Sequence, residues 1–237
     1  MEKHEIFNQA IGREKFEGCN KEDLLSIGIT IGSDNVAFKE LYTAYFADEA
    51  RFEYKPRRGA KIEVEFNRLD DEVLIKRLET ELKFCVSQFL DYLNLLTLCF
   101  SNIYPLGSIV ELDEKLFTKE FFNASGVKEG ESSLLAVITA RFVPVDENNE
   151  QQFVEYVATQ YPSGAIGVMY LNQALIKGVV HNGYSDEKEK AYVQELREEL
   201  VMSNKKSIAF LTKDEVDVLI KYREARRRKK MTDGEVS

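Results

Sequence analysis

The side chains that most often perform enzymatic chemistry are few and scattered in this 237-residue chain. His4 lies among charged residues, and His181 precedes Asn182-Gly183, a pair typical of turns. Neither histidine has an identifiable serine, cysteine or carboxylate partner, and two histidines cannot form a histidine-rich metal site. We therefore expect neither a histidine-activated nucleophile nor a metal centre.

Cysteines and glycines offer no stronger candidates. Cys19, Cys85 and Cys99 are far apart, and an odd number of isolated cysteines is typical of a reducing compartment. Gly164 and Gly167 lack the spacing and the following lysine of a phosphate-binding loop, and they lack the glycine pattern of a dinucleotide site. We expect no cofactor, and we interpret the chain as a binding protein rather than an enzyme.

Two basic segments could hold an anionic partner. Arg57 and Arg58 could bind an anion, although a solvated turn is the simpler interpretation of this loop. The C-terminal basic run, Arg223 to Lys230, could bind nucleic acid, although solvated cations at a helix end are the default. Because the formal net charge is −9, we do not expect nucleic acid to be the main partner.

Composition predicts a globular cytoplasmic protein. The chain is 44% hydrophobic and 31% charged, as is ordinary for globular domains. Met1–Cys19 has no apolar segment of the kind found in signal peptides. The most apolar run, Phe89–Phe100, contains Asp91 and Asn94 and is shorter than the roughly 18–20 residues of a membrane span. We therefore expect a cytoplasmic location and no membrane span.

The part of the chain after residue 103 predicts a small antiparallel sheet. Four short apolar or alternating runs, bounded by turn-forming residues, are typical of strands. They are Ser108–Leu112, Leu134–Val145, Phe153–Tyr161 and Lys177–Tyr184. Tyr161-Pro162-Ser163-Gly164 predicts a turn. An acidic helix capped by Ser185 and reaching Met202 follows the sheet, and Thr212-Lys213-Asp214-Glu215 is a capping box that begins a final helix.

The N-terminal half predicts mostly helix with one hairpin. The expected elements are a helix in Met1–Glu17, a brief strand in Gly28–Gly32, a helix capped by Ser33 or Asp34 and running to about Ala47, and strands Arg51–Lys55 and Lys61–Asn67. The fold class is therefore α+β, a small antiparallel sheet packed by helices behind a helix-rich N-terminal half. We place the domains at 1–102, 103–204 and 205–237.

One long helix is predicted from about Asp70 to Ser101. Two apolar rows recur every seven residues, and a third row is confined to the C-terminal half. The rows are Ile75, Leu82, Phe89 and Leu96; Leu78, Cys85, Tyr92 and Cys99; and Val86, Leu93 and Phe100. We expect the wide half, together with the Ser185–Met202 helix, to cover the sheet. The narrow half, Ile75, Leu78 and Leu82, is a candidate partner surface, with internal packing of the whole helix as the alternative.

Several short motifs between Ile103 and Tyr184 resemble a known family in their order and spacing. Their distinctive residues are Pro105, Gly107, Ser108, Gly164, Gly167, Asn172, Gly183 and Tyr184. The stretch resembles a domain-of-unknown-function family encoded beside LXG toxins in type VII secretion loci of Gram-positive bacteria. The resemblance covers residues 103 to about 200. Glu114–Ser133 is a long insertion relative to that family, and the preceding hundred residues are not explained by it.

The resemblance implies a cytoplasmic accessory or chaperone-like role. Members look like factors that hold a toxin before export, with a secreted toxin or a small helical secretion factor as the partner. The chain is not itself a WXG-type secreted protein, because it contains no tryptophan. An immunity protein that neutralises a toxin is the alternative, since acidic charge would suit a basic nuclease. The candidate partner-binding residues are Ile75, Leu78, Leu82, Tyr161, Pro162 and Ile166.

Overall fold

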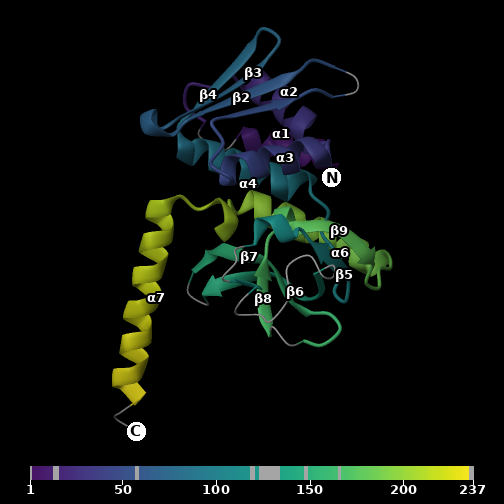
Figure 1. The fold of residues 1–237 in the computed structure, drawn as a ribbon, viewed down its shortest axis with the longest axis vertical. Coiled ribbons are helices and arrows are strands. Elements are labelled where there is room, and N and C mark those ends of the chain that lie inside the picture. Colours follow the sequence, from purple (N-terminus) through teal and green to yellow (C-terminus); the bar gives the residue numbers. More distant parts are fainter. Residues whose placement is uncertain are drawn as a thin grey trace.

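A computed structural model describes residues 2–12, 16–56, 59–117, 121–122, 134–146, 149–164 and 167–234, with the backbone alone for residues 149, 223 and 226–234. Two sheets lie at opposite ends of the body, and helices form the layer between them (Figure 1). The predicted α+β class is confirmed, as is the helix-rich N-terminal half. Within the described residues, each helix is too short or too polar to cross a membrane.

The first sheet is an antiparallel meander that packs on the N-terminal helices. Its strands follow one another in the order β1-β2-β3-β4, and the predicted hairpin forms its first two strands. The bounds are α1 (Lys3–Ile11), α2 (Lys21–Gly32), α3 (Asn35–Phe46), β1 (Arg51–Tyr54), β2 (Ile62–Asn67), β3 (Glu72–Arg77) and β4 (Thr80–Phe84).

The predicted helix from Asp70 to Ser101 is wrong in its first half. Residues 72–84 form the β3–β4 hairpin, and α4 spans only Val86–Phe100. Ile75 and Leu82, seven residues apart, are cross-strand partners in this hairpin. Their spacing therefore arises from two alternating strands joined by a tight turn, in which Leu78 has a φ of 55°.

The brief strand predicted at Gly28–Gly32 is also wrong, because these residues belong to α2. The helix begins after Asn20, whose side chain accepts hydrogen bonds from Glu22 N and Asp23 N. A Cβ atom at Gly28 would lie 2.4 Å from the Phe7 ring. This glycine is therefore required by close packing of α2 on α1, rather than by strand structure.

The second sheet has the strand order β10-β7-β6-β5-β9, with β8 also paired to β7. All pairings are antiparallel except the short parallel pair of β10 and β7. The four predicted strands are present, whereas β8 and β10 were not predicted. The bounds are β5 (Ile109–Leu112), β6 (Leu135–Asp146), β7 (Asn149–Gln160), β8 (Val168–Leu171), β9 (Ile176–His181) and β10 (Lys206–Ser207).

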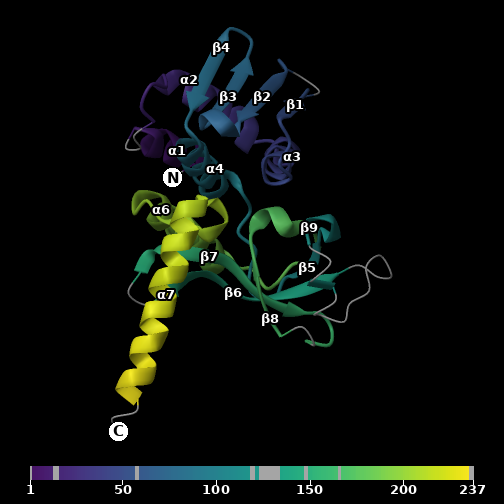
Figure 2. The ribbon, with the colours of Figure 1, turned by 60° about the vertical axis from the view of Figure 1, so that its left-hand side comes forward.

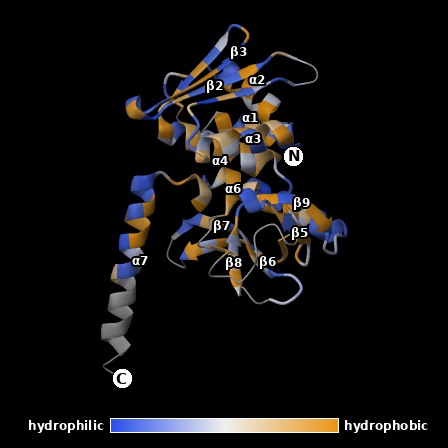
Figure 3. Cartoon of the chain, in the orientation of Figure 1, coloured by the Kyte–Doolittle hydropathy of each residue, from blue (hydrophilic) through white to orange (hydrophobic). Residues whose placement is uncertain are grey.

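Two apolar cores hold the fold together. The first joins the N-terminal helices and first sheet to α4 and α6 (Glu187–Met202), and the second sheet adds Phe153 to it. The second sheet encloses its own core, including Val110, Ile138 and Tyr156. The expectation that α4 mainly covers the second sheet is therefore wrong, because Leu93 packs in the first core. Figure 3 shows hydrophobic residues concentrated where α4 lies between the sheets.

The final helix, α7 (Lys213–Gly234), projects away from the body in both ribbon views (Figures 1 and 2). Its predicted capping box is present: Thr212 N donates to Glu215 Oε2 at 2.7 Å, and Glu215 N donates to Thr212 Oγ1 at 3.2 Å. The preceding helix, α6, is capped by Asp186 instead of the predicted Ser185. Arg57, Arg58 and the side chains of 226–230 lie outside what the structure describes.

Candidate interaction site

Four of the motif residues meet at one point and stabilise the start of the second sheet. Ser108 is completely buried, and its hydroxyl donates to Pro105 O at 2.8 Å. The Ser108 hydroxyl oxygen also accepts a hydrogen bond from Gly183 N at 2.9 Å. Gly107 has a φ of 79°, and its N–H donates to Ile138 O. The motif therefore joins the turn before β5 to the chain leaving β9, which is a structural role.

Gly183→Ala is expected to destabilise the protein by roughly 2–4 kcal/mol, because the new Cβ would lie 2.1 Å from Leu106 O. The matched control is Gly107→Ala, whose Cβ meets no heavy atom within 4 Å and which loses only the freedom to adopt positive φ, about 1–2 kcal/mol. Urea unfolding of both variants measures the difference. Equal losses of stability would contradict the close-approach argument.

The remaining motif residues form turns and caps. Gly164 N donates to Gln160 O at 2.7 Å, which closes the predicted turn, and Gly167 N donates to Gly164 O at 3.0 Å. Tyr161, Pro162 and Tyr184 are exposed, so they remain available to a partner. Ile166 lies outside the described residues.

The predicted partner surface at Ile75, Leu78 and Leu82 does not exist as a surface. Ile75 and Leu82 are buried in the first core, at 0% and 1% exposure. Leu78 is 80% exposed, but it stands alone at the hairpin turn. Because the helix assumed for these residues is a hairpin, their side chains do not form one exposed row.

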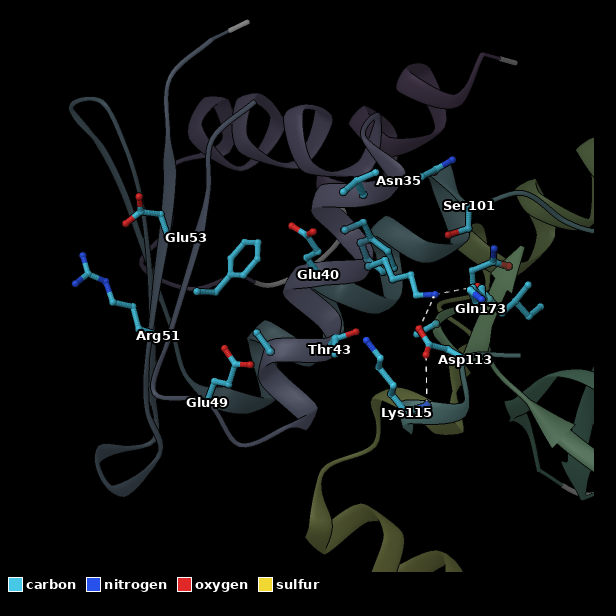
Figure 4. A pocket seen from close by; sticks show the side chains of 18 of the residues that line it. Asn35, Glu40, Thr43, Glu49, Arg51, Glu53, Ser101, Asp113, Lys115 and Gln173 are labelled. Atoms are coloured by element: carbon cyan, nitrogen blue, oxygen red, sulfur yellow. Dashed lines mark hydrogen bonds and ion pairs between the residues drawn. The ribbon is translucent and has the colours of Figure 1, made fainter. Parts of the chain in front are cut away.

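A groove of about 810 Å³ lies between the N-terminal half and the second sheet. Figure 4 shows α3 along its floor, with β1 on one bank and Asp113, Lys115 and Gln173 on the other. None of the described residues predicted to bind a partner lines it. The groove is therefore a second, larger candidate for an interaction site.

The floor of the groove is the outer face of α3. Asp34 caps this helix by accepting from Val36 N and Ala37 N at 3.0 and 3.3 Å. The opposite face of the helix is buried in the first core, where it includes Leu41. The groove-facing residues recur at the spacing of one helical face; they are Val36, Lys39, Glu40 and Thr43.

Lys39 connects the floor of the groove to the bank that contains Asp113. Its ammonium lies 3.3 Å from Asp113 Oδ2 and donates to Ile176 O at 3.3 Å. Asp113 also accepts from Lys115 N at 3.4 Å, which fixes the turn after β5. The ion pair is only partly exposed, so it holds α3 against the second sheet more firmly than a fully solvated pair would.

Beneath the groove, polar groups form a second connection between the halves. Asn172 Nδ2 donates to the Tyr42 hydroxyl at 3.0 Å, while Asn172 Oδ1 accepts from Ala174 N at 3.0 Å. Gln173 Nε2 donates to the Tyr104 hydroxyl at 3.0 Å. Burial raises the pKa of Tyr42, so this phenol remains neutral at physiological pH.

A buried carboxyl group belongs to the same network. Glu155 is 3% exposed, and it accepts from Ser207 Oγ at 2.8 Å and from Gln173 N at 2.7 Å. Burial raises its pKa to about 7, while these two hydrogen bonds lower it. Through Glu155, strand β7 is joined both to β10 and to the short helix over Gln173–Leu175.

The groove combines the exposed apolar side chain of Val36 with carboxylates and with the ammonium groups of Lys39, Lys115 and Lys177. Among described residues, the side chains of Glu40, Glu49 and Lys115 form no hydrogen bond or ion pair. His4 and His181 are exposed and do not line it. The described part of the chain contains no cluster of three or more metal-binding side chains. This arrangement can bind a partner through apolar contacts and charge.

Sequence reasoning missed the groove residues, because they come from distant segments. Lys39 and Ile176 are 137 positions apart. One local signal pointed to the polar network beneath the groove. Glu155 lies in the otherwise apolar run Phe153–Ala158, where the four consecutive residues from 153 to 156 are buried. A carboxyl group inside such a run predicts a buried polar contact.

Comparisons with known proteins place a family match on the second sheet. No curated protein and no solved structure matched the chain. The match begins after the Pro105–Ser108 motif and includes Asn172 and Gly183. It thus covers the strands from β6 to β9 and the first residues of α6. Residues 125–192 match the model of a family described as a domain of unknown function (DUF4176).

Proposed function

We propose that this is a non-catalytic cytoplasmic protein that binds a segment of a partner polypeptide in the groove above α3. The observation that carries the proposal is the groove itself, an open channel of about 810 Å³ at the junction of the two halves. Its floor offers the apolar side chain of Val36, 56% exposed, and its charged side chains include Glu40 and Lys115. Such surfaces suit protein recognition, in which an apolar centre is surrounded by polar groups.

For the partner, we propose a type VII secretion toxin of the LXG class, bound before export, or a small helical secretion factor. The order of the motifs from Pro105 to Tyr184 supports this proposal through the family they resemble. The match of residues 125–192 to a domain of unknown function is compatible with it. In this role the protein holds its partner in a form ready for export.

An immunity function is the second candidate, and the net charge of −9 favours it. An acidic protein attracts a basic toxin and speeds their association. The two functions differ in the toxin segment that is bound. Survival of cells that express the isolated toxic domain with this protein supports immunity, whereas binding without protection supports the export role.

Co-purification with the toxins and helical factors encoded in its own locus tests the proposed function. We expect one stable complex, weakened at least tenfold by Thr43→Arg, which places a long charged side chain in the groove. The matched control is Glu195→Arg, an exposed position on α6 outside the groove. Absence of any complex would overturn the proposed partner class, and equal binding by Thr43→Arg would overturn the groove as the site.

A further inference from the structure

We infer that β1 is the receiving edge of the groove: the partner supplies an extended segment that pairs with β1 as an additional strand and carries basic side chains toward Glu40 and Glu49. The inference rests on the proposed function and specifies how the partner is held. Strand addition to an exposed sheet edge is a common form of peptide recognition, because main-chain hydrogen bonds supply affinity and side-chain pockets supply specificity.

The position of the groove relative to β1 is the first support. Among the described strands, β1 pairs only with β2, so it is an edge of the first sheet. The groove is lined by three consecutive β1 residues, Arg51, Phe52 and Glu53, and by no residue of β2. A groove over a sheet face would meet alternate residues of several strands. Lining by consecutive residues of one strand indicates that the groove follows its free edge.

The hydrogen-bond register shows which β1 groups face outward. Phe66 N donates to Ala50 O, and the register continues with Phe52 opposite Val64. In an antiparallel pair, directly opposed residues alternate between hydrogen-bonded and non-hydrogen-bonded positions. Ala50 and Phe52 therefore face β2, while the backbone N–H and C=O groups of Arg51 and Glu53 point away from it. These groups can form a ladder with an added strand.

The floor favours an alternating segment over a helix. An added strand would direct every second side chain toward α3, where Val36 and Thr43 line the groove. Phe52 of β1 also lines the groove, but its side chain is only 8% exposed. Small or β-branched apolar residues in the partner would suit this shallow floor.

Charge identifies further side chains on the same, floor-facing side of the partner strand. The Glu53 carboxylate is within 3.3 Å of Lys61, and Arg51 is paired with Glu63 at 2.6 Å, so these charges are already matched. Glu40 and Glu49 line the groove without a hydrogen-bond or ion-pair partner among the described residues. Glu40 lies on the floor, and Glu49 lies in the connection from α3 to β1 (Figure 4). Lysine or arginine side chains on the floor-facing side of an added strand would reach them.

The probe is a capped peptide that repeats valine-threonine-lysine-threonine, which places valine and lysine on the same face of a strand; the matched peptide has glutamate in place of lysine. NMR titration of the intact protein should show at least tenfold tighter binding of the lysine peptide. Hydrogen exchange should slow at the amides of Arg51 and Glu53, which face the free edge. The double variant Glu40→Gln, Glu49→Gln should lose most of the preference for the lysine peptide.

Backbone pairing is tested with Glu53→Pro against Glu53→Thr. Both remove the ion pair with Lys61, but only proline removes the outward N–H, and edge strands tolerate proline where the N–H faces solvent. We expect at least tenfold weaker peptide binding for Glu53→Pro and near wild-type binding for Glu53→Thr. If Glu53→Pro does not fold, a version of the lysine peptide with every peptide nitrogen methylated should bind at least tenfold more weakly to the wild-type protein.

Equal binding of the two peptides, or equal binding by the proline and threonine variants, would overturn strand addition. So would undiminished binding of the N-methylated peptide. These outcomes are separate from the test of the proposed function. A locus-encoded partner that binds and is blocked by Thr43→Arg, with no response to Glu53→Pro, leaves the groove as the site and removes β1 pairing as the mode.

Discussion

Ile75→Asp is expected to unfold the protein or to destabilise it by roughly 4 kcal/mol or more. Ile75 has 0% exposure on the central strand β3, where it lies between Val64 and Leu82. An aspartate there must either bury a charge without a partner or bind a proton, and both outcomes cost several kcal/mol. Since domains of this size are stable by only about 5–15 kcal/mol, most or all of the stability is at risk.

Leu78→Asp is the matched control, three residues along the same hairpin. Leu78 is 80% exposed and has a φ of 55°, a conformation that aspartate accepts more readily than leucine does. We expect a change within about 0.5 kcal/mol or a slight gain in stability. Urea unfolding followed by circular dichroism measures both variants. An Ile75→Asp variant with nearly the stability of the wild type would mean that β3 does not occupy the centre of this core.

The two variants also show why a heptad pattern was misleading here. Ile75 and Leu82 are seven positions apart, which is a helical repeat in a sequence and also the separation of cross-strand partners in a tight hairpin. Val73 and Ile75 do alternate, as residues of a strand do. The apolar residues of α4, however, continue the seven-residue spacing, so the whole segment resembles a single helix. Short apolar runs are compatible with both periods, so tertiary pairing decides between them.

Elements with strong local signals were predictable. The caps at Asp34 and Thr212 and the alternating strand β2 form as their side chains dictate. Strand β8 was missed because its four residues, VMYL, are all apolar, so the sequence shows no alternation even though their burial alternates. Strand β10 was missed because two residues carry no pattern. Both strands exist because the long strand β7 offers them hydrogen bonds.

The groove lies beyond local signals, since no single segment contains it. Its floor comes from α3, its edge from β1, and its far bank from residues near Asp113 and Gln173. The motif residues that could be recognised, such as Ser108 and Gly183, stabilise the second sheet and do not line the groove. Recognisable motifs here mark backbone geometry, whereas the candidate interaction surface depends on which segments meet.

The buried carboxyl group of Glu155, in the polar network beneath the groove, makes the stability of the fold depend on pH. This group has a pKa of about 7 in the folded protein, against an ordinary value of 4.5. The nearby Tyr42 hydroxyl stays neutral. The direct hydrogen-bond partners of Glu155 are the uncharged Ser207 and Gln173. Because the folded pKa is raised, the folded state binds this proton more tightly than the unfolded state does. The contribution of this proton to the free energy of unfolding is therefore fully present below about pH 4.5. It is lost as the pH rises through about 7.

Glu155→Gln is expected to remove this dependence. The amide oxygen can still accept from Gln173 N, and the amide nitrogen can donate toward Ser207, as the protonated acid does. At pH 8 the variant should be more stable than the wild type by up to roughly 3 kcal/mol, the free energy of a shift from 4.5 to about 7. At pH 4 the two should be nearly equal.

The measurement is the difference in unfolding free energy between Glu155→Gln and the wild type, taken by urea denaturation at intervals from pH 4 to pH 8. Subtraction cancels the titration of other carboxylates, and Glu195→Gln, an exposed glutamate on α6, should give a difference that stays near zero. A Glu155→Gln difference that does not change with pH, or that favours the wild type at pH 8, would mean that the carboxylate is well stabilised in the fold. In that case the Ser207 and Gln173 hydrogen bonds would outweigh the cost of burying the charge.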